Sequence, residues 1–134
     1  MIYVDTSAML KLYVDESDSE RVESLLALDR EWYTGRLTLV EVRRNLARIL
    51  PDLGSRQRAL AAFARDFERA HVIELDAATC EAAAAIAEST GSKSLDAMHL
   101  ACALRSGAGR QAFLTFDRGQ AQAARALGFP LPVP

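Results

Sequence analysis

Four acidic side chains are spaced so that each falls where the chain passes into a helix. Asp5 follows the apolar run Ile2–Val4, which is typical of a buried parallel strand, and Asp117 follows a second such run. Glu41 and Asp96 each fall in the first turn of a predicted helix. In parallel α/β sheets these positions share the carboxyl edge, where ligands bind. We therefore expect the four carboxylates to meet at one edge of the sheet.

Each carboxylate also has a purely local explanation at a helix N-terminus. Thr38 and Glu41 have the spacing of a capping box, in which Thr38 opens the helix. Asp5 and Asp117 are good N-caps, and Asp96 suits the positive end of a helix dipole, although the rest of its helix is largely apolar. The sequence leaves both explanations open, and they differ in whether the acids converge.

Carboxylates that do converge in one pocket repel one another and usually require a hard divalent cation. Oxygen ligands with room for water suit Mg²⁺ or Mn²⁺. A zinc site is not indicated, because His71 and His99 are far apart in the sequence, and we interpret both as structural. A carboxylate-held Mg²⁺ without a nucleophilic serine or cysteine indicates phosphoryl chemistry, in which the metal generates hydroxide and neutralises charge on the phosphate.

The elements that must position these acids alternate between short apolar strands and helices. Strands are predicted at residues 2–4, 32–34, 71–75, 112–116 and, at the edge only, 129–133. Helices are predicted at residues 8–13, 18–29, 38–50, 55–70, 77–90, 95–105 and 118–127. This order predicts a single α/β domain over residues 1–134, with a central parallel sheet of about four to five strands and helices on both faces. The strand at 112–116 is expected to be central.

The charge of the chain is balanced overall but uneven along the sequence. Sixteen basic and eighteen acidic residues give a net charge of −2, which argues against non-specific nucleic-acid binding by the whole surface. The segment Arg36–Arg69, however, holds eight arginines and four acids, a local charge of +4. Within it Arg44 and Arg48 share a helix face with an acid candidate, and Lys93 and Arg118 stand beside the others. All four are candidate phosphate contacts, although a solvated helix surface explains the charge equally well.

Membrane insertion and export are not indicated by the sequence. No apolar run approaches the roughly 18 residues of a membrane span. The N-terminus lacks the basic region and small-residue cleavage site of a signal peptide. We therefore expect a cytoplasmic protein.

Four segments together resemble the PIN domain, and in particular the VapC-type toxins of bacterial toxin–antitoxin pairs. The matching segments, in family order, are Val4–Ala8, Thr38–Val42, Leu95–Ala101 and Leu114–Asp117. Each is weak alone, but they occur in the expected order from Val4 to Asp117, so the resemblance extends over nearly the whole chain. The resemblance implies an Mg²⁺-dependent endoribonuclease, Mn²⁺ being the alternative metal, with these catalytic and metal-binding residues: Asp5, Glu41, Asp96 and Asp117.

The resemblance also implies supporting residues and partners. Ser7 and Thr115 match polar positions that support the metal or its waters, whereas Asp117 matches the most variable acid of the family. A homodimer is implied, and so is a cognate VapB-type antitoxin that wraps the toxin and blocks its site. Typical substrates of the family are structured RNAs such as transfer RNA, cut at one place.

Other functions fit parts of the same pattern. A receiver domain shares the parallel topology, but it requires paired acids after the first strand and a lysine near the last. A haloacid-dehalogenase-type phosphatase requires a second aspartate at the position of Ser7. A nucleic-acid-binding module with a PIN fold, or a nuclease that acts on DNA without a toxin role, remains compatible with the sequence.

Overall fold

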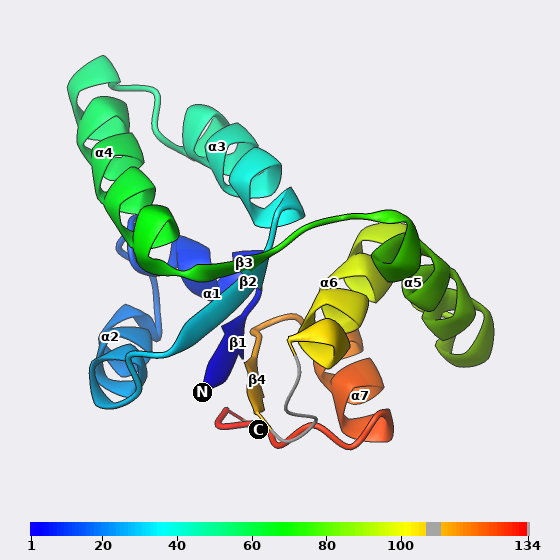
Figure 1. Ribbon diagram of the computed structural model, residues 1–134. Coiled ribbons are helices and arrows are strands. Elements are labelled where there is room, and N and C mark those ends of the chain that lie inside the picture. Colours follow the sequence, from blue (N-terminus) through cyan, green and yellow to red (C-terminus); the bar gives the residue numbers. More distant parts are fainter. Residues whose placement is uncertain (107–110, 134) are drawn as a thin grey trace.

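The fold is built on one parallel sheet in a computed structural model that describes residues 1–106 and 111–133 (Figure 1). Across these residues the sheet has four strands: β1 (Ile2–Val4), β2 (Trp32–Gly35), β3 (His71–Ile73) and β4 (Ala112–Leu114). Their spatial order is β3-β2-β1-β4, and every neighbouring pair is parallel. In the interior strand β1, Ile2 lies opposite Trp32 on one side and Ala112 on the other. Parallel strands cannot be joined by tight turns, so helices supply the connections.

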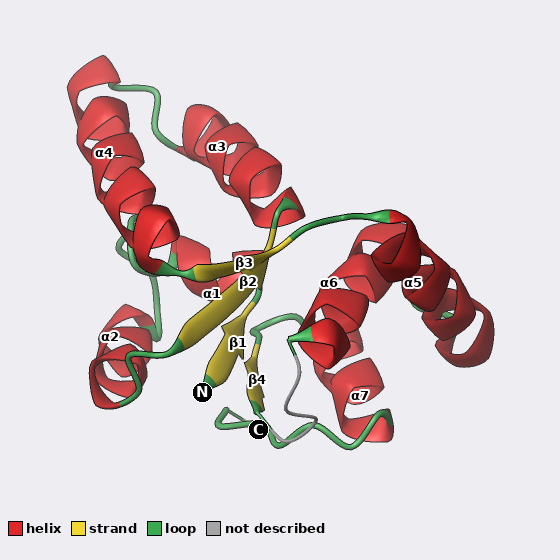
Figure 2. Ribbon diagram, in the orientation of Figure 1, coloured by secondary structure: helices red, strands yellow, loops and turns green. Residues whose placement is uncertain are grey.

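Helices cover both faces of the sheet (Figure 2). The described residues form seven: α1 (Thr6–Leu10), α2 (Ser19–Leu28), α3 (Leu37–Ile49), α4 (Leu53–Arg69), α5 (Ala77–Thr90), α6 (Ser94–Arg105) and α7 (Arg118–Ala126). The first four gather on one side of the sheet and the last three on the other (Figure 1). The predicted α/β class is therefore confirmed. Within the described ranges, no helix has both the length and the apolar character needed to cross a membrane.

Alternation along β1 divides the core into two layers. Ile2 and Val4 pack into the cluster formed with α1 to α4, whereas Tyr3 points to the other face and packs with α5 to α7. The Tyr3 ring stacks on that of Phe113, with centroids 5.1 Å apart. Burial of each such side chain contributes roughly 1.5–3 kcal/mol. The strand is thus anchored from both sides, and Asp5, which follows it directly, has a fixed position.

Gly35, at the end of β2, allows α6 to lie close against the sheet. A β-carbon at this position would lie 2.5 Å from Leu37 Cδ2 and 2.9 Å from Cys102 Sγ. Cys102 is fully buried in the middle of α6, which packs on β2. The missing side chain therefore lets the two elements approach, and this contact places the start of α6 near the carboxyl edge.

The strand that precedes α5 is shorter than predicted. β3 ends at Ile73 and does not continue to Leu75. Asp76 does not join the carboxylates of the other strands, because it caps α5 by accepting the backbone N–H of Thr79 at 2.8 Å.

The last part of the chain also differs from the prediction. β4 ends at Leu114 and is an edge strand, although it was expected to be central. Residues 129–133 form no strand; Phe113 donates its N–H to the carbonyl of Pro130 at 2.9 Å, and the prolines have no N–H with which to continue a ladder. The same segment buries Phe129 and Val133 against the sheet. This cover explains why an edge strand has the sequence of a buried one.

Candidate active site

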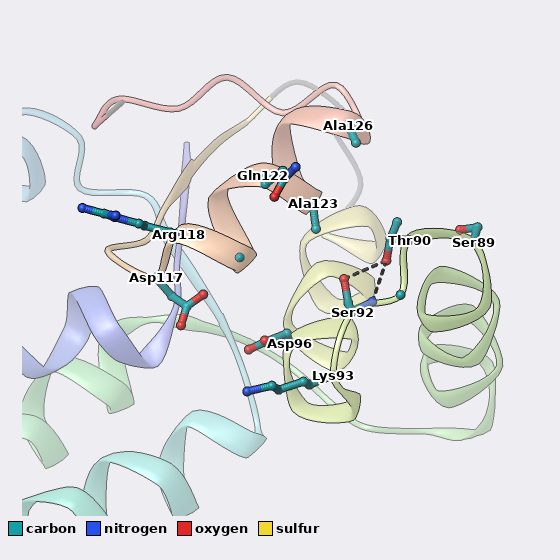
Figure 3. A pocket seen from close by; sticks show the side chains of 12 residues that line it. Ser89, Thr90, Ser92, Lys93, Asp96, Asp117, Arg118, Gln122, Ala123 and Ala126 are labelled. Atoms are coloured by element: carbon teal, nitrogen blue, oxygen red, sulfur yellow. Dashed lines mark hydrogen bonds between the residues drawn. The ribbon is translucent and has the colours of Figure 1, made fainter.

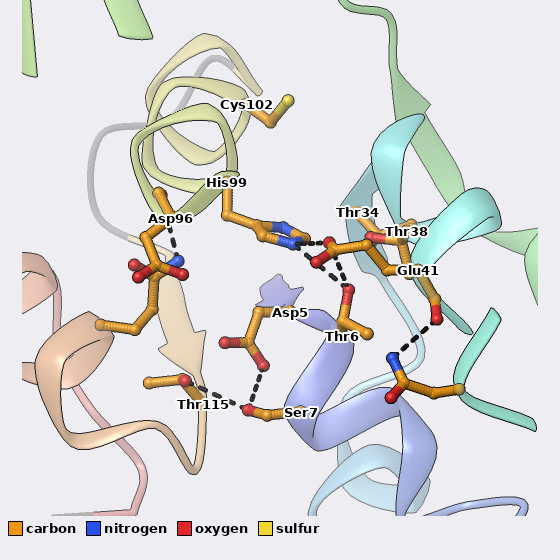
Figure 4. Close-up of polar contacts among 12 residues, drawn as sticks. Asp5, Thr6, Ser7, Thr34, Thr38, Glu41, Asp96, His99, Cys102 and Thr115 are labelled. Carbon is orange, nitrogen blue, oxygen red and sulfur yellow. Dashed lines mark hydrogen bonds and ion pairs between the residues drawn. The ribbon is translucent and has the colours of Figure 1, made fainter. Parts of the chain in front are cut away.

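The four acids predicted from the sequence line one small cavity at the carboxyl edge of the sheet. Three of them, Asp5, Glu41 and Asp96, are shown in Figure 4. The volume of the cavity is about 210 Å³. Asp5 follows β1, Glu41 lies in α3, Asp96 in the first turn of α6, and Asp117 precedes α7. The remaining lining residues are Thr6, Ser7, Leu10, Asn45 and His99. We call the wall formed by α1 and α3 the α3 side, and the wall formed by α6 and α7 the α7 side.

Asp5 caps α1 and faces the cavity at the same time. Its Oδ1 accepts the backbone N–H of Ala8 at 3.0 Å and the hydroxyl of Ser7 at 2.7 Å. Because Asp5 itself is the cap, α1 begins at Thr6, earlier than predicted. Burial raises the pKa of the Asp5 carboxyl above its ordinary value, although the charge that His99 can carry and these hydrogen bonds oppose the shift.

Glu41 is held by donors from two other helices. Thr6 Oγ1 donates to Glu41 Oε1 at 2.8 Å, and His99 Nε2 lies 2.7 Å from the same oxygen (Figure 4). The predicted capping box was wrong: α3 begins one residue before Thr38 without a side-chain cap. Thr38 is fully buried, and its hydroxyl lies 2.7 Å from that of Thr34 in the sheet. Glu41 is therefore free to reach the cavity.

His99 is at the centre of this network, although the sequence indicated only a structural role. It is buried, with Nε2 toward Glu41 and Nδ1 2.9 Å from the hydroxyl of Tyr3. An ionised carboxylate only accepts hydrogen bonds, so we assign the proton to Nε2 and let Tyr3 donate to Nδ1. The available signal was its spacing: His99 follows Asp96 by three residues, which puts both on one face of α6.

The hydrogen bonds to Glu41 also set its charge. Burial alone raises the pKa of Glu41, but the donors His99 and Thr6 together hold that pKa below its ordinary value. The Glu41 carboxylate therefore stays ionised to lower pH than that of an isolated glutamate.

The α7 side carries two acids with less support from the protein. Asp117, which is exposed, caps α7 by accepting the N–H of Gln120 at 2.8 Å. The buried Gln120 also donates to the backbone carbonyl of Asp96 at 3.2 Å and so ties α7 to α6. No hydrogen bond to the Asp96 carboxylate comes from any residue in the described ranges. Burial, followed by the negative charge of Asp117, raises the pKa of Asp96.

Ser7 and Thr115 connect the two sides. Their hydroxyl oxygens lie 3.3 Å apart, and Thr115 Oγ1 accepts the N–H of Asp117 at 3.1 Å. Ser7 Oγ in turn accepts the N–H of Phe116 at 2.9 Å. These bonds fix the loop after β4 against the start of α1, so both residues orient carboxylates. Their predicted support of a metal or its waters stays a prediction.

Comparison with known proteins identifies the family. A family model described as the PIN domain matches residues 2–126. The chain belongs to the PIN-domain family. Ribonuclease VapC35 of Mycobacterium tuberculosis is 33% identical over 138 residues, which span 100% of this chain and 97% of the relative. The predicted resemblance to VapC-type PIN domains is therefore confirmed.

Solved PIN-type structures share the same fold. VapC20 of Mycobacterium tuberculosis, described as a sarcin-ricin loop cleaving toxin, superposes with a TM-score of 0.74 at 22% identity, covering 92% of this chain and 95% of that one. A toxin–antitoxin complex from Klebsiella pneumoniae gives a TM-score of 0.66 at 18% identity, covering 87% of each chain. At these identities the two likenesses concern the fold alone.

The acids of this PIN domain have the chemistry of an oxygen-ligand metal site. PIN-domain ribonucleases are generally metal-dependent. As the side chains stand, no three His, Cys, Asp or Glu residues of the described part of the chain are close enough together to hold a metal ion. Even so, Asp5 and Asp96 both have raised pKa values, and the Asp96 carboxylate keeps its lone pairs available. Positive charge between them would relieve both.

The two arginine candidates of α3 differ in their relation to the cavity. Arg48 donates to Asn45 Oδ1 at 3.0 Å, and Asn45, which lines the cavity, donates to the carbonyl of Glu41 at 2.8 Å. Arg48 is thus joined to the site through one residue. Arg44 is exposed on α3 and is not among the lining residues.

The two basic candidates of the α7 side lie in a neighbouring and larger cavity. Lys93 and Arg118 both line it, together with Asp96 and Asp117, which the two cavities share (Figure 3). The Lys93 side chain extends alongside Asp96, whereas that of Arg118 points away from it (Figure 3). Basic groups therefore stand on both sides of the acids.

Proposed function

We propose that this protein is an Mg²⁺-dependent endoribonuclease that acts as the toxin of a toxin–antitoxin pair. The supporting observation is that a VapC-type PIN domain brings four carboxylates from separate elements into one cavity. Asp5, Glu41, Asp96 and Asp117 would hold the cation, with Mn²⁺ as the alternative. A divalent cation at such a site acidifies water and neutralises charge on the phosphate and the leaving oxygen.

The protein's own groups would orient the acids before RNA binds. His99 and Thr6 hold Glu41, and Ser7 holds Asp5, which is the role of residues that support metal ligands. The α7 side would contribute the less constrained charge of Asp96. Four basic residues would hold flanking phosphates of the RNA: Arg44 and Arg48 on α3, and Lys93 and Arg118 near α7.

The proposed partners are an RNA substrate, a VapB-type antitoxin and a second copy of the chain. The name of the curated relative supports ribonuclease activity, and the toxin–antitoxin complex among the structural neighbours supports an antitoxin. A structured RNA such as transfer RNA suits a site of this kind. The homodimer rests on the family resemblance alone.

RNA cleavage is the first test of the proposal. Purified antitoxin-free protein is incubated with total cellular RNA, with Mg²⁺ or with chelator, and the new RNA ends are mapped. Discrete ends should appear with Mg²⁺ and be absent with chelator or with Asp5→Asn. Asp76→Asn is the matched control, because Asp76 caps α5 outside the cavity. Undiminished cleavage in chelator would contradict the metal mechanism, and cleavage of DNA instead of RNA would favour the DNA-directed alternative.

The toxin role has its own test. Expression of the protein alone should arrest growth, and co-expression of the antitoxin encoded by a short reading frame beside its gene should relieve the arrest. Harmless expression of the soluble, intact protein would count against the toxin assignment.

A further inference from the structure

A second cavity adjoins the acid cavity and opens between the α5–α6 turn and α7 (Figure 3). Its volume is about 750 Å³. The two cavities have Asp96 and Asp117 in common, so these acids form the wall between them. Whatever binds in the larger cavity is therefore in contact with two residues of the proposed catalytic set.

The sizes of the two cavities suit different parts of an RNA. Sites that hold small ligands typically measure about 300 to 1,000 Å³. The acid cavity, at about 210 Å³, falls below that range, whereas the larger cavity falls within it. The first has room for a phosphate and a cation, and the second has room for a nucleoside that is still attached to that phosphate.

The walls of the larger cavity are polar and fixed. The Thr90 hydroxyl donates to the carbonyl of Ile86 at 2.7 Å and lies 2.7 Å from the hydroxyl of Ser92, whose backbone N–H donates back to Thr90 Oγ1 (Figure 3). Gly91 turns the chain between them in the left-handed region, with open space where a side chain would be. Because the Thr90 proton goes to Ile86, the Ser92 hydroxyl donates to Thr90 and keeps its own lone pairs as spare acceptors.

The cavity is lined by two basic residues beside its two acids. Lys93 and Arg118 line it, and neither forms an ion pair with any residue of the part of the chain that the structure describes. Lys93 is exposed and extends alongside Asp96, which is where a phosphate next to the scissile one would pass (Figure 3). Ala123 and Ala126 on α7 supply an apolar surface for a base.

We propose that this cavity is a subsite for one unpaired RNA nucleotide next to the scissile phosphate, with Lys93 on its phosphate and the α5–α6 turn against its sugar or base. The proposal rests on the proposed endoribonuclease function. An unpaired nucleotide can be turned out of its stack into such a cavity, whereas a base-paired one carries its partner with it. The cavity between the α5–α6 turn and α7 would therefore accept the nucleotide next to the scissile phosphate only when that nucleotide is unpaired.

Binding of a fluorescein-labelled single-stranded RNA of mixed sequence tests the subsite. All variants carry Asp5→Asn so that the probe is not cut. Gln122→Trp should fill the cavity, and its matched control is Gln57→Trp, because both glutamines are exposed on helices and Gln57 lies on α4 away from the cavity. We expect Gln122→Trp to weaken binding about tenfold or more, the usual weight of one bound base, and Gln57→Trp to leave it unchanged. A duplex of the same sequence should not distinguish the two variants.

The charge of Lys93 is tested in the same assay. Lys93→Glu should weaken binding and reduce the slope of log Kd against log salt by about 0.7, the value for one phosphate contact on a single strand. Arg21→Glu is the control, because Arg21 is exposed and lies on α2, away from the cavity. If Lys93→Glu and Gln122→Trp bind the probe as their controls do, the subsite is wrong.

Cleavage separates failure of the subsite from failure of the function. In protein that retains Asp5, Gln122→Trp and Lys93→Glu should each raise KM more than they lower kcat. Binding that depends on the cavity without any cleavage by the unmodified protein would overturn the proposed function and keep the subsite. Cleavage that is indifferent to both cavity variants would overturn the subsite and keep the function.

Discussion

The α3 side and the α7 side of the acid cavity support their carboxylates differently. On the α3 side Asp5 and Glu41 each accept hydrogen bonds from two residues. On the α7 side Asp117 accepts one backbone N–H, and Asp96 accepts none from the residues that the structure describes. The pKa values of Glu41 and Asp96 differ in the same sense, since that of Glu41 is lowered and that of Asp96 is raised. Asp5 departs from this division, because burial raises its pKa in spite of its hydrogen bonds.

This difference distinguishes a carboxylate that only caps a helix from one whose oxygens are left available to a ligand. A carboxylate that only stabilises its own helix is satisfied by that helix, as Asp76 is at the start of α5. Asp96 lies in a first helical turn, yet its carboxylate faces a like charge and the cavity. Hydrogen bonds from the protein thus fix the carboxylates of the α3 side, whereas the Asp96 carboxylate on the α7 side accepts none from the described residues.

The largest expected effect is the loss of a proposed ligand. Asp5→Asn keeps the shape of the side chain and can still cap α1, but it removes the charge. RNA cleavage should fall by more than about 100-fold, the upper end of the loss seen when a residue that merely supports a ligand is removed. Single-turnover cleavage measures this, with Asp76→Asn as the control. Equal activity of the two variants would reduce Asp5 to a cap.

The support of the α3 side is tested at His99. His99→Ala removes the donor to Glu41 and should lower activity or metal affinity by about 10–100-fold. His99→Gln, whose amide can still donate, should retain more activity, and His71→Ala should have little effect, because His71 is exposed on β3. The measurement is the cleavage rate as a function of Mg²⁺ concentration. Identical losses in His99→Ala and His99→Gln, with unchanged dependence on Mg²⁺, would indicate a packing role only.

In metal-free protein, neutralising Glu41 and neutralising Asp96 should change the melting temperature in opposite directions. A lowered pKa means that the ionised Glu41 stabilises the fold above its unfolded pKa and that this stability is lost as pH falls through the folded pKa. A raised pKa means that protonated Asp96 is favoured by the fold, so stability is lost as pH rises through its folded pKa. At neutral pH in chelator, Glu41→Gln should therefore lower the melting temperature, and Asp96→Asn should raise it by a few degrees.

Thermal melts at several pH values measure this contrast. The Asp96→Asn difference should shrink as the pH falls toward about 4, near the ordinary pKa of an aspartate, because Asp96 is then protonated in the folded state. The Glu41→Gln difference should persist at that pH and shrink only at lower pH, because the folded pKa of Glu41 is lowered. A drop in melting temperature for Asp96→Asn as well would remove the distinction between the two sides.

The smallest effects are expected at the α3 arginines. Arg48→Ala and Arg44→Ala should each reduce the salt slope of RNA binding by about 0.7 if each contacts one phosphate. Arg48 should matter more, because it is joined through Asn45 to the cavity lining. Filter binding over a series of salt concentrations measures the slope of log Kd against log salt. An unchanged slope in the double variant would mean that both arginines are solvated surface residues that contact no phosphate.

The sequence could predict where the acids lie, because that position follows from local order. A buried strand followed at once by an aspartate puts Asp5 at the carboxyl edge in any parallel sheet. The same rule placed Asp117 correctly even though β4 proved to be an edge strand. The fold class followed for the same reason, since short apolar runs separated by helices allow few other arrangements.

The sequence could not predict contacts between distant segments. The bond from His99 to Glu41 spans 58 residues, and that from His99 to Tyr3 spans 96. The capping box at Thr38 failed for another reason, because the Thr38 hydroxyl pairs with that of Thr34, only four residues earlier, at 2.7 Å. Propensity describes what a residue can do near itself, and packing decides which alternative is used.

The most direct test of the proposed metal site is the stabilisation of the protein by Mg²⁺. A ligand at about 100 times its Kd stabilises the folded state by about 2.7 kcal/mol. Thermal melts of the unmodified protein, Asp96→Asn and Asp76→Asn are compared in chelator and over a series of Mg²⁺ concentrations. We predict that Mg²⁺ raises the melting temperature of the unmodified protein and of Asp76→Asn by the same amount, and that of Asp96→Asn by much less. The higher melting temperature of Asp96→Asn in chelator should therefore approach that of the unmodified protein, or fall below it, as Mg²⁺ is added. An equal response of all three proteins to Mg²⁺ would contradict a metal site in the acid cavity.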